Sequence, residues 1–270
     1  MPRKEGGHRD CYKKSKRVIA IDFKTVNANQ VLKDDFVNEY RKGISFFYSQ
    51  LVNLNVNLFI IDKIRKFPFK IFCNASETIF FSMVLNNFFE VSVLTITRLV
   101  TDTAGDLYTL PKLKNSIRAN IKPEYLNEYS ELLRTKKFDA GVNTLLGRAK
   151  ILRNESIAHI KKEAIEQTEH LKISELESLR DALNDLLDSI SFDVTHLMLP
   201  IEYDEQVQHP EGTDSRSDIE RILDRVAFDS RKLNLPEVMP QIWPGVRSKM
   251  SPQELEIFNS YRRKLRLSEA

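Results

Sequence analysis

Apolar side chains recur every three or four residues along most of the chain, which is the spacing of one face of an α-helix. From about Val31 this repeat predicts a first long helix of roughly thirty residues. Its apolar face consists of Phe36, Tyr40, Ile44, Phe47, Leu51, Leu54, Leu58 and Ile61. The segment KFPFK should end this helix, because proline lacks a backbone N–H and disfavours helical geometry in the residue before it.

The segment NASE predicts the start of a second long helix. Asn74 can accept a hydrogen bond from the first turn while Glu77 bonds back to the Asn74 backbone, which is a capping box. This helix should run into the segment TDTAGDLY, where Gly105 is a natural stop. We expect a short helix after it, over residues 110–121.

Two more long helices follow from the same kind of pattern. Pro123 opens a third helical stretch that continues to His159, with a bend expected near Asp139 and Gly141. The segment SELE (174–177) is a second capping box and should begin a fourth helix. The apolar face of the fourth helix consists of Leu176, Leu179, Leu183, Leu186, Ile190, Val194 and Leu197.

Four long amphipathic helices with short connections favour an all-α fold, an antiparallel four-helix bundle with extra short helices. The bundle should span residues 31–199, after a basic N-terminal arm at 1–30. A polar linker with prolines (200–216) then leads to a C-terminal helical extension (217–270). The extension should contain a short helix at about 218–229 and a last basic helix that the segment SPQE caps.

The composition agrees with a helical protein in a reducing compartment. The chain has only 8 glycines, which argues against a strand-and-turn architecture. Its two cysteines, Cys11 and Cys73, cannot form a disulfide framework, so we expect a cytoplasmic location. The first seventeen residues run through charges without the apolar core of a signal peptide. The apolar stretch 71–100 is long enough to cross a membrane, but Glu77 and Glu90 would be costly in lipid. We therefore expect a helix buried on several sides and no membrane partner.

Positive charge gathers at both ends of the chain. Residues 1–17 hold seven basic and two acidic side chains, a net charge of +5. Residues 261–270 hold four basic and one acidic side chain, a net charge of +3, so with +3 overall the middle carries −5. Such ends can attract phosphates or can simply be solvated tails, and the sequence leaves both open. It also leaves open whether VIAIDF (18–23) is a short strand or an extended arm.

Familiar catalytic and metal-binding motifs fail on spacing or context. GVNTLLGRAK has five residues between its glycines and Arg148 where a phosphate-binding loop needs lysine. His8 and Cys11 have metal-like spacing but no second pair, and Glu166 and His170 are an ordinary helix-surface pair. No nucleophile elbow is present in the sequence. We therefore expect neither a metal nor a cofactor.

The segment LRNESIAHI (152–160) carries the candidate chemistry. An arginine, four to six residues and a histidine form the sparse motif of the metal-independent HEPN ribonucleases, and Arg153 with His159 is similar to it. In this composition chance alone gives roughly one match, and Arg3 with His8 is a second one. The spacing therefore needs support from its surroundings.

Two sequence blocks together resemble the abortive-infection (Abi-U type) branch of the HEPN superfamily. In LRNESIAH, asparagine directly follows the arginine, and Ile-Ala-His ends the block. VLTITRLVTDTAGDLYTLPKLKNSI (93–117) is similar to a second signature, in which a long helix ends in Arg-Leu and an acidic residue before a glycine-containing loop and a short helix. The corresponding residues are Arg98, Leu99, Asp102, Gly105 and Leu110. The resemblance covers about residues 32–198 and leaves 200–270 outside.

The resemblance implies an HEPN-like bundle that acts as a metal-independent endoribonuclease, a phage-defence or toxin effector whose products end in a 2′,3′-cyclic phosphate. His159 would be the general acid/base, Arg153 the clamp on the transition state and Asn154 the orienting residue. Candidate substrate-binding residues are Arg98, Asp102, Lys161 and Lys162. The implied partners are RNA, a second copy of the chain in a homodimer, and an antitoxin or another defence-system protein.

The chemistry suits these residue types. Metal-free cleavage needs proton transfers at the ribose 2′-hydroxyl and at the leaving 5′-oxygen, and a histidine with a near-neutral pKa can serve both. Arginine is a permanently charged, forked donor for the phosphate. Six helical residues turn through about 600°, so Arg153 and His159 point roughly 120° apart and one helix hardly completes a site. A dimer that joins two motifs across a cleft fits this geometry.

A purely structural role for Arg153 and His159 remains an alternative. Arg153 could pair with a neighbouring carboxylate while His159 caps or packs, which would leave a catalytically silent bundle that binds RNA, a nucleotide or a protein. One feature also departs from the family. Many HEPN toxins that a partner nucleotidyltransferase silences carry a tyrosine two residues after the histidine, whereas this chain has Lys161. The resemblance therefore does not extend to that mode of control.

Overall fold

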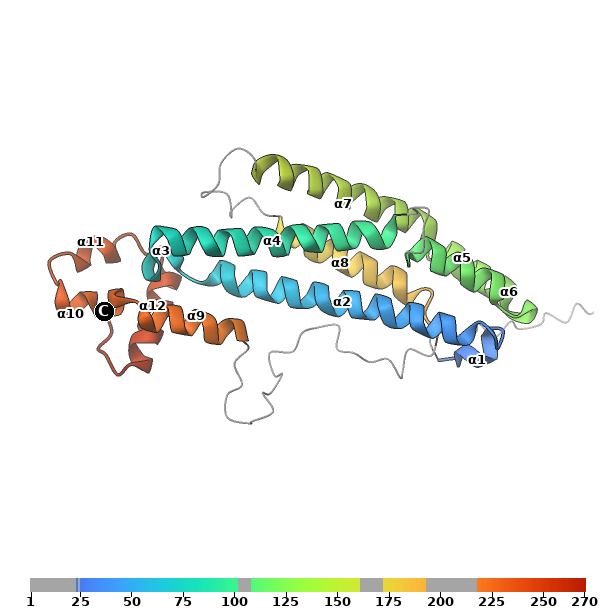
Figure 1. Ribbon diagram of the computed structural model, residues 1–270, viewed down its shortest axis with the longest axis horizontal. Helices are drawn as coiled ribbons and strands as arrows, with labels where there is room; N and C mark the ends of the chain where they lie inside the picture. Colours follow the sequence, from blue (N-terminus) through green and yellow to red (C-terminus); the bar gives the residue numbers. More distant parts are fainter. Residues whose placement is uncertain (1–22, 24, 102–107, 161–171, 193–217) are drawn as a thin grey trace, which may run out of the picture.

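Four long helices dominate the molecule. The computed structural model describes residues 23, 25–101, 108–160, 172–192 and 218–270, and the regular elements in these ranges are all helical (Figure 1). The long helices are α2 (Val37–Lys66), α4 (Ala75–Val100), α7 (Phe138–Ile160) and α8 (Ile173–Asp188), each antiparallel to the one before it. Helix α4 packs against α2 and α7, and α8 packs against all three. The expected all-α antiparallel bundle is confirmed.

An aromatic cluster closes one end of the bundle. The rings of Phe23, Tyr40, Tyr129 and Phe192 lie with centroids 5.3–6.0 Å apart. The Tyr40 hydroxyl donates to the Phe192 carbonyl at 3.2 Å and accepts from the Phe192 N–H at 2.5 Å. Burial of each such ring stabilises the fold by about 2–3 kcal/mol. These contacts hold the segment after α8 against the start of α2.

The first long helix begins later than the apolar repeat predicts. Val31 ends a separate short helix, α1 (Ala28–Val31), and α2 starts only at Val37. Between them Leu32 is extended and forms an isolated antiparallel bridge with Ile121. The backbone N–H of Lys33 donates to Asn120 at 2.9 Å, so a contact with a distant segment takes the place of helix continuation. The predicted start near Val31 is wrong for this reason.

The second long helix starts as predicted. Asn74 caps α4 by accepting from the Glu77 N–H at 2.9 Å, and the Glu77 carboxylate accepts from the Asn74 N–H at 2.8 Å. The helix ends at Val100, and the predicted stop at Gly105 lies outside the described residues. The short helix expected next is confirmed as α5 (Leu110–Asn120).

The third helical stretch breaks close to the predicted bend. It consists of a turn of 3₁₀ helix, η1 (Pro123–Tyr125), then α6 (Leu126–Thr135) and α7. The break falls at Lys137, whose φ of 50° is left-handed, two residues before Asp139. Gly141 serves a close approach instead of a bend, because a Cβ built on it would meet Leu186 Cδ2 at 2.9 Å.

The fourth long helix begins without the predicted capping box. Lys172 precedes the first helical residue of α8, and its side chain makes no capping hydrogen bond. The buried Ile173 starts the helix one residue before the serine of SELE, so that serine is already helical. The helix ends at Asp188, and Ile190 is buried beyond its end. Val194 and Leu197 lie outside the described residues.

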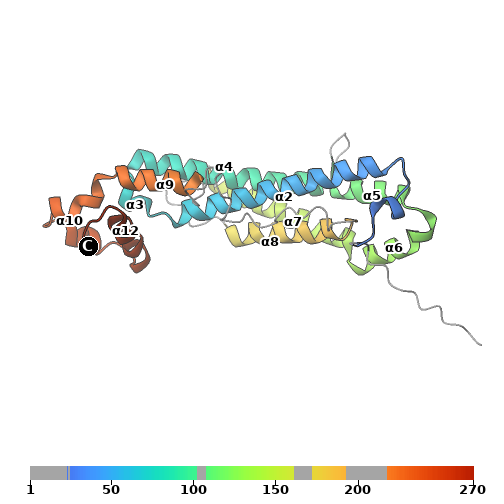
Figure 2. The same ribbon diagram turned by 90° about the horizontal axis from the view of Figure 1, so that it is seen from below.

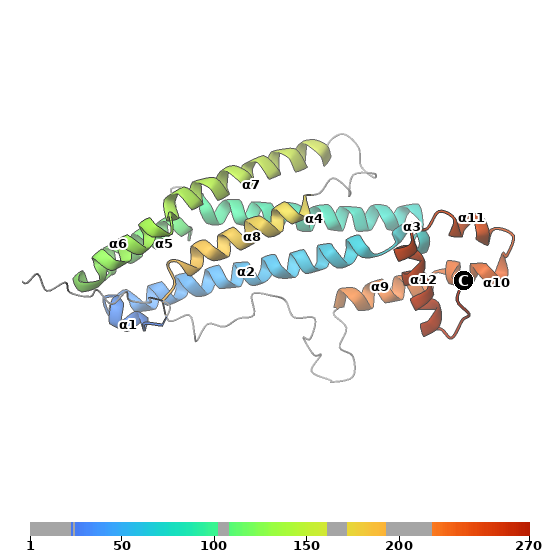
Figure 3. The same cartoon turned by 180° about the vertical axis from the view of Figure 1, so that it is seen from behind.

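The C-terminal extension packs onto the end of the bundle where α2 meets the short helix α3 (Phe69–Phe72) (Figures 2 and 3). Its elements are α9 (Asp218–Asp229), η4 (Arg231–Asn234), α10 (Leu235–Val238), α11 (Trp243–Arg247) and α12 (Pro252–Lys264). The helix expected at about 218–229 is confirmed, as is the capping box at the start of α12. Phe72 stacks on Phe258, with ring centroids 5.9 Å apart, and Trp243 also stacks on Phe258, with centroids 5.1 Å apart. The extension and the bundle thus share one aromatic core.

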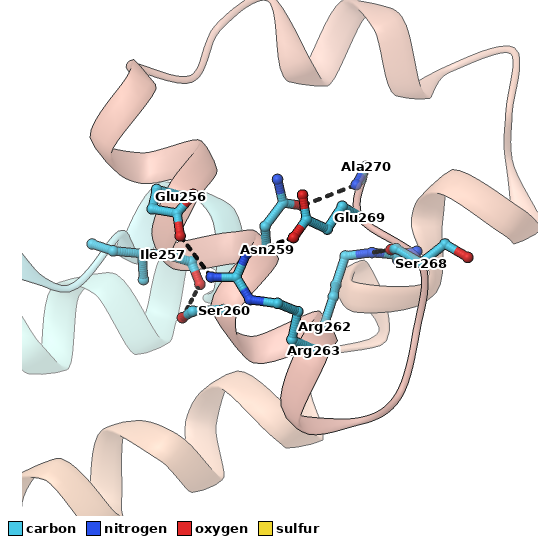
Figure 4. A network of polar contacts seen from close by, with 9 residues as sticks. All are labelled: Glu256, Ile257, Asn259, Ser260, Arg262, Arg263, Ser268, Glu269 and Ala270. Atoms are coloured by element: carbon cyan, nitrogen blue, oxygen red, sulfur yellow. Dashed lines mark hydrogen bonds and ion pairs between the residues drawn. The ribbon is translucent and has the colours of Figure 1, made fainter.

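One arginine in the basic end of the chain is buried, whereas Arg263, Lys264 and Arg266 are exposed. The Arg262 guanidinium is fully buried and donates to the carbonyl of Leu233 and to the Glu237 carboxylate. It also donates to the carbonyl of Ser268 (Figure 4). Arg263, its neighbour, pairs on the surface with Glu256 and Glu269. The sequence left open whether 261–270 attracts phosphates or is a solvated tail. In the structure, carboxylates and carbonyls of this same extension bind the side chains of Arg262, Arg263 and Lys264. The basic segment 1–17 lies outside the described residues.

Two helices pass a length-and-composition test for membrane spans, namely α2 over Val37–Lys66 and the α4 segment Ser76–Val100. The apolar core helices of a bundle pass the same test, and these two helices pack on each other. Helix α4 is nevertheless less covered than expected. One of its faces is exposed and apolar, whereas the sequence predicted burial on several sides.

Candidate functional site

Helix α7 carries the candidate catalytic residues. Its inward face consists of Phe138, Val142, Leu145, Ala149 and Leu152, all buried at three- or four-residue spacing. This stripe docks α7 on α4 and α8. Arg153 directly follows the last buried leucine and lies at the edge of the packed face, half-buried, and Asn154 is exposed one residue further. The core packing therefore fixes where Arg153 leaves the helix.

Arg153 and Asn154 are in contact. The Arg153 guanidinium donates from Nη2 to Asn154 Oδ1 at 3.3 Å. No carboxylate among the described side chains pairs with Arg153, in contrast to Arg148, which binds Glu175 at 2.8 Å. The ion pair between Arg153 and a neighbouring carboxylate, expected for a purely structural role, is thus not seen in the described part of the chain. The remaining guanidinium donors of Arg153 can reach a ligand.

The histidine of the motif can be placed by its backbone only. Helix α7 includes the backbone of His159, while its side chain lies outside the described residues. The rise from Arg153 to His159 is about 9 Å, and the rotation between them leaves the two side chains roughly 120° apart. Three of the predicted substrate-binding residues, Asp102, Lys161 and Lys162, also lie outside the described residues.

Arg98 lies on a different helix from Arg153 and toward a different end of the bundle. It is exposed near the C-terminal end of α4. A shallow hollow between α2 and α4 is lined by Phe46, Gln50, Thr95, Arg98, Leu99 and Tyr108. Since α4 and α7 run antiparallel, Arg98 lies toward the start of α7, whereas Arg153 is fifteen residues, or about 22 Å, beyond that start. One copy of the chain does not bring these two arginines together.

An apolar stripe covers the solvent side of α4. Phe80 and Met83 are 59% and 60% exposed, Val91 is 52% exposed and Leu94 is 38% exposed. We call these four residues the α4 stripe. Their spacings of three, eight and three residues place them along one line of the helix, which Arg98 continues. The sequence shows only a very apolar helix here, because neighbouring helices decide which of its apolar side chains are buried.

A group of basic residues gathers around the start of α7, and the sequence analysis missed it. Lys114 and Arg118, four residues apart on α5, face Arg134 and Lys137 from the end of α6. The spacing on α5 is visible in the sequence, but the turn at Lys137 that brings the second pair to it is not. Among the described residues no group of three or more His, Cys, Asp or Glu side chains has a metal-binding arrangement.

Comparison with known protein families identifies a family for this chain. No curated protein and no solved structure matches the chain. Residues 68–210 match the sequence model of the family HEPN_AbiU2, described as AbiU2. The matched segment is just over half of the chain, and it contains α4, α7, α8 and the Arg153–His159 motif. It begins after α2 and ends beyond residue 198, so it is displaced toward the C-terminus from the predicted range of 32–198. The chain belongs to the AbiU2 family of HEPN proteins.

Proposed function

We propose that the protein is a metal-independent endoribonuclease that acts as an effector in abortive-infection defence. The observation that carries the proposal is the placement of Arg153 on α7, at the edge of the packed face and with no carboxylate partner among the described side chains. Membership of the AbiU2 family supports the same reading. The proposal includes RNA as substrate, a cytoplasmic location and control by an antitoxin or another defence-system protein.

Each motif residue has one role in this proposal. His159 transfers protons to and from the ribose and the leaving oxygen, for which a near-neutral pKa is suited. The Arg153 guanidinium binds the phosphate as its charge grows in the transition state. Asn154 is a positioning residue, because its Oδ1 accepts from Arg153 Nη2 at 3.3 Å and restricts the fork. Arg98 on α4 binds the substrate strand at a place separate from the Arg153 of the same copy.

We further propose that the active form is a homodimer that buries the α4 stripe. A single α7 points Arg153 and His159 to different sides, so a second copy is needed to bring an arginine and a histidine to one phosphate. The α4 stripe offers an apolar line about 21 Å long, from Phe80 to Leu94, on the helix that packs beside α7. A two-fold axis across it would bring the same stripe of both copies together.

Cleavage of RNA by the purified protein in EDTA tests the chemistry. Arg153→Ala and His159→Ala should each abolish cleavage, and Arg153→Lys should restore little, because an ammonium lacks the fork. Lys150→Ala is the matched control, since Lys150 is an exposed cation one turn away on the same helix. Cleavage products should end in 2′,3′-cyclic phosphates. Full activity of Arg153→Ala, or loss of wild-type cleavage in EDTA, would contradict the proposed mechanism.

Light scattering with chromatography tests the dimer. Leu94→Glu places a charge in the α4 stripe and should convert a dimer to a monomer that no longer cleaves RNA. Ile222→Glu is the matched control, because Ile222 is a similarly exposed aliphatic residue on α9, away from the stripe. A fully active wild-type monomer at micromolar concentration would rule out the shared site.

A further inference from the structure

The basic residues at the start of α7 surround a groove of about 420 Å³ between α5 and the α6–α7 turn. Its lining consists of Lys114, Arg118, Ser130, Leu133, Arg134, Lys137, Phe138, Asp139 and Ala140. Four of these side chains are cations and one is an anion. The groove is therefore basic, although residues 18–260 as a whole carry a net charge of −5.

Two of the four cations are already compensated. Lys114 Nζ lies 2.7 Å from Asp139 Oδ1, and its side chain is only 12% exposed. The Arg134 fork holds both carboxylate oxygens of Glu131, at 2.6 and 2.9 Å. The first pair joins α5 to the start of α7, the second lies within α6, and each carboxylate compensates the charge of its partner. The groove needs other residues to attract a ligand.

The other two cations have no such partner. Among the described residues, no side chain or carbonyl accepts a hydrogen bond from the Arg118 guanidinium or the Lys137 ammonium. Lys137 stands at the left-handed position of the turn, with a φ of 50°, which aligns the end of α6 with the start of α7. The groove thus presents two uncompensated positive charges from two different elements.

The first turn of α7 adds backbone donors to the same groove. The N–H of Gly141 donates to the Lys137 carbonyl at 2.9 Å. The N–H groups of Phe138, Asp139 and Ala140 come before that bond and have no acceptor inside the helix. All three residues line the groove, at the positive end of a 23-residue helix dipole. Amide donors, a lysine and an arginine together suit the oxygens of phosphate groups.

We infer that this groove binds the phosphate backbone of an RNA strand, away from the site of cleavage. The inference rests on the proposed ribonuclease function. The groove is open to solvent, which suits a strand that lies across it. Arg153 lies about 22 Å from the groove along α7. A stacked strand with a rise of about 3.4 Å per nucleotide spans that length in at most about seven nucleotides. One RNA strand therefore reaches both places.

Fluorescence anisotropy with a 2′-O-methyl RNA of about twenty nucleotides, which cannot be cleaved, tests the groove independently of activity. The double variant Arg118→Ala/Lys137→Ala should bind more weakly, and its dependence of log Kd on log salt should be flatter by about 1.4, because each lost phosphate contact on a single strand contributes about 0.7. The matched control is Arg225→Ala/Lys249→Ala, which removes one exposed arginine and one exposed lysine from the C-terminal extension. The control should keep the wild-type slope.

Three results would overturn the inference. The groove variant could keep the wild-type affinity and salt slope, or the control could lose as much, which would reduce the effect to net charge. Stoichiometric binding of inorganic phosphate without binding of RNA would assign the groove to small anions.

Cleavage assays separate the groove from the site of cleavage. The groove variant should raise the KM for long RNA, and it should leave the KM for a trinucleotide unchanged, because a trinucleotide is too short to reach both places. RNA binding that depends on the groove without any cleavage by the wild type would remove the proposed ribonuclease function and leave the groove in place.

Discussion

Replacement of Arg262 by methionine should specifically weaken the C-terminal extension. Methionine fills much of the aliphatic volume but removes every donor of the guanidinium. The carbonyl of Leu233 would then be buried without a partner, which costs about 2 kcal/mol. The bonds to Ser268 and Glu237 lie nearer to solvent and contribute about 0.5–1 kcal/mol each. The expected loss in the free energy of unfolding is about 3 kcal/mol.

The single tryptophan of the chain reports on this change directly. Trp243 stacks on Phe258, and the guanidinium of Arg262 lies over the same ring at 5.9 Å. Urea unfolding followed by tryptophan fluorescence should show a midpoint about 1.5 M lower in Arg262→Met, for a slope of about 2 kcal/mol/M. Circular dichroism, which follows the whole bundle, should change less at the same urea concentrations.

The neighbouring arginine provides the control. Arg263 is 47% exposed and forms two surface ion pairs, so Arg263→Met should leave the fluorescence midpoint nearly unchanged. If the two variants lost the same stability, the buried hydrogen bonds of Arg262 would not stabilise the extension. The reasoning from unsatisfied carbonyls would then be refuted.

The loss of stability in Arg262→Met should also depend on pH. The hydrogen bonds from Arg262 hold the pKa of the Glu237 carboxyl below its ordinary value of 4.5. A depressed carboxyl pKa stabilises the folded state above the unfolded pKa, and this contribution is lost as the pH falls through the folded pKa. The difference in midpoint between wild type and Arg262→Met should therefore narrow as the pH is lowered from about 5 toward 3. A difference that stays constant over this range would contradict the assignment.

Two further predictions concern the packing of α7 and α3. Gly147→Ala, on the open side of α7, should stabilise the fold by about 0.5–1 kcal/mol. Gly141→Ala should destabilise it by about 1 kcal/mol, because the added Cβ would press on Leu186. Equal effects of the two variants in urea unfolding would contradict this packing. Burial raises the pKa of the Cys73 thiol to about 11, so in a Cys11→Ser variant Cys73 should resist a thiol reagent at pH 8 until urea unfolds the protein. Rapid modification of the native variant would count against that burial.

Local signals predicted the helices whose ends are capped by their own sequence. The boxes at Asn74 and Ser251 formed as expected, because both partners of each box lie within four residues. The box expected at SELE did not, since burial of Ile173 starts α8 one residue earlier. The capping motif and the burial of apolar side chains compete to set where a helix begins, and only the capping motif can be recognised in the sequence.

Features that depend on contacts between distant residues could not be predicted from the sequence. Leu32 leaves the helical pattern because it pairs with Ile121, 89 positions away, and nothing near Leu32 indicates that pairing. Arg262 has the same character. It lies in a basic run that is typical of a solvated tail, and only Leu233 and Glu237, nearly thirty residues earlier, make its burial favourable.

The candidate site is intermediate between these cases. The motif and the helix that carries it could be predicted, because Arg153 and Asn154 are neighbours in sequence and the buried residues of α7 determine which side of the helix faces the core. The exposed side of α4 and the groove around Lys137 could not. Each depends on which helix covers which, and on a left-handed turn at a residue type that rarely adopts one.

The shared aromatic core also sets the order in which the molecule can be completed on the ribosome. Phe72 is covered by Phe258 and Tyr261, which are synthesised more than 180 residues later. At about 5–20 residues per second, that interval lasts roughly 10–40 s. Before that interval ends, α2, α4, α7 and α8 have been synthesised and can assemble while the aromatic end of α3 faces water. A nascent or truncated chain would offer this patch to chaperones or to other nascent copies, and only synthesis of α12 removes the exposure.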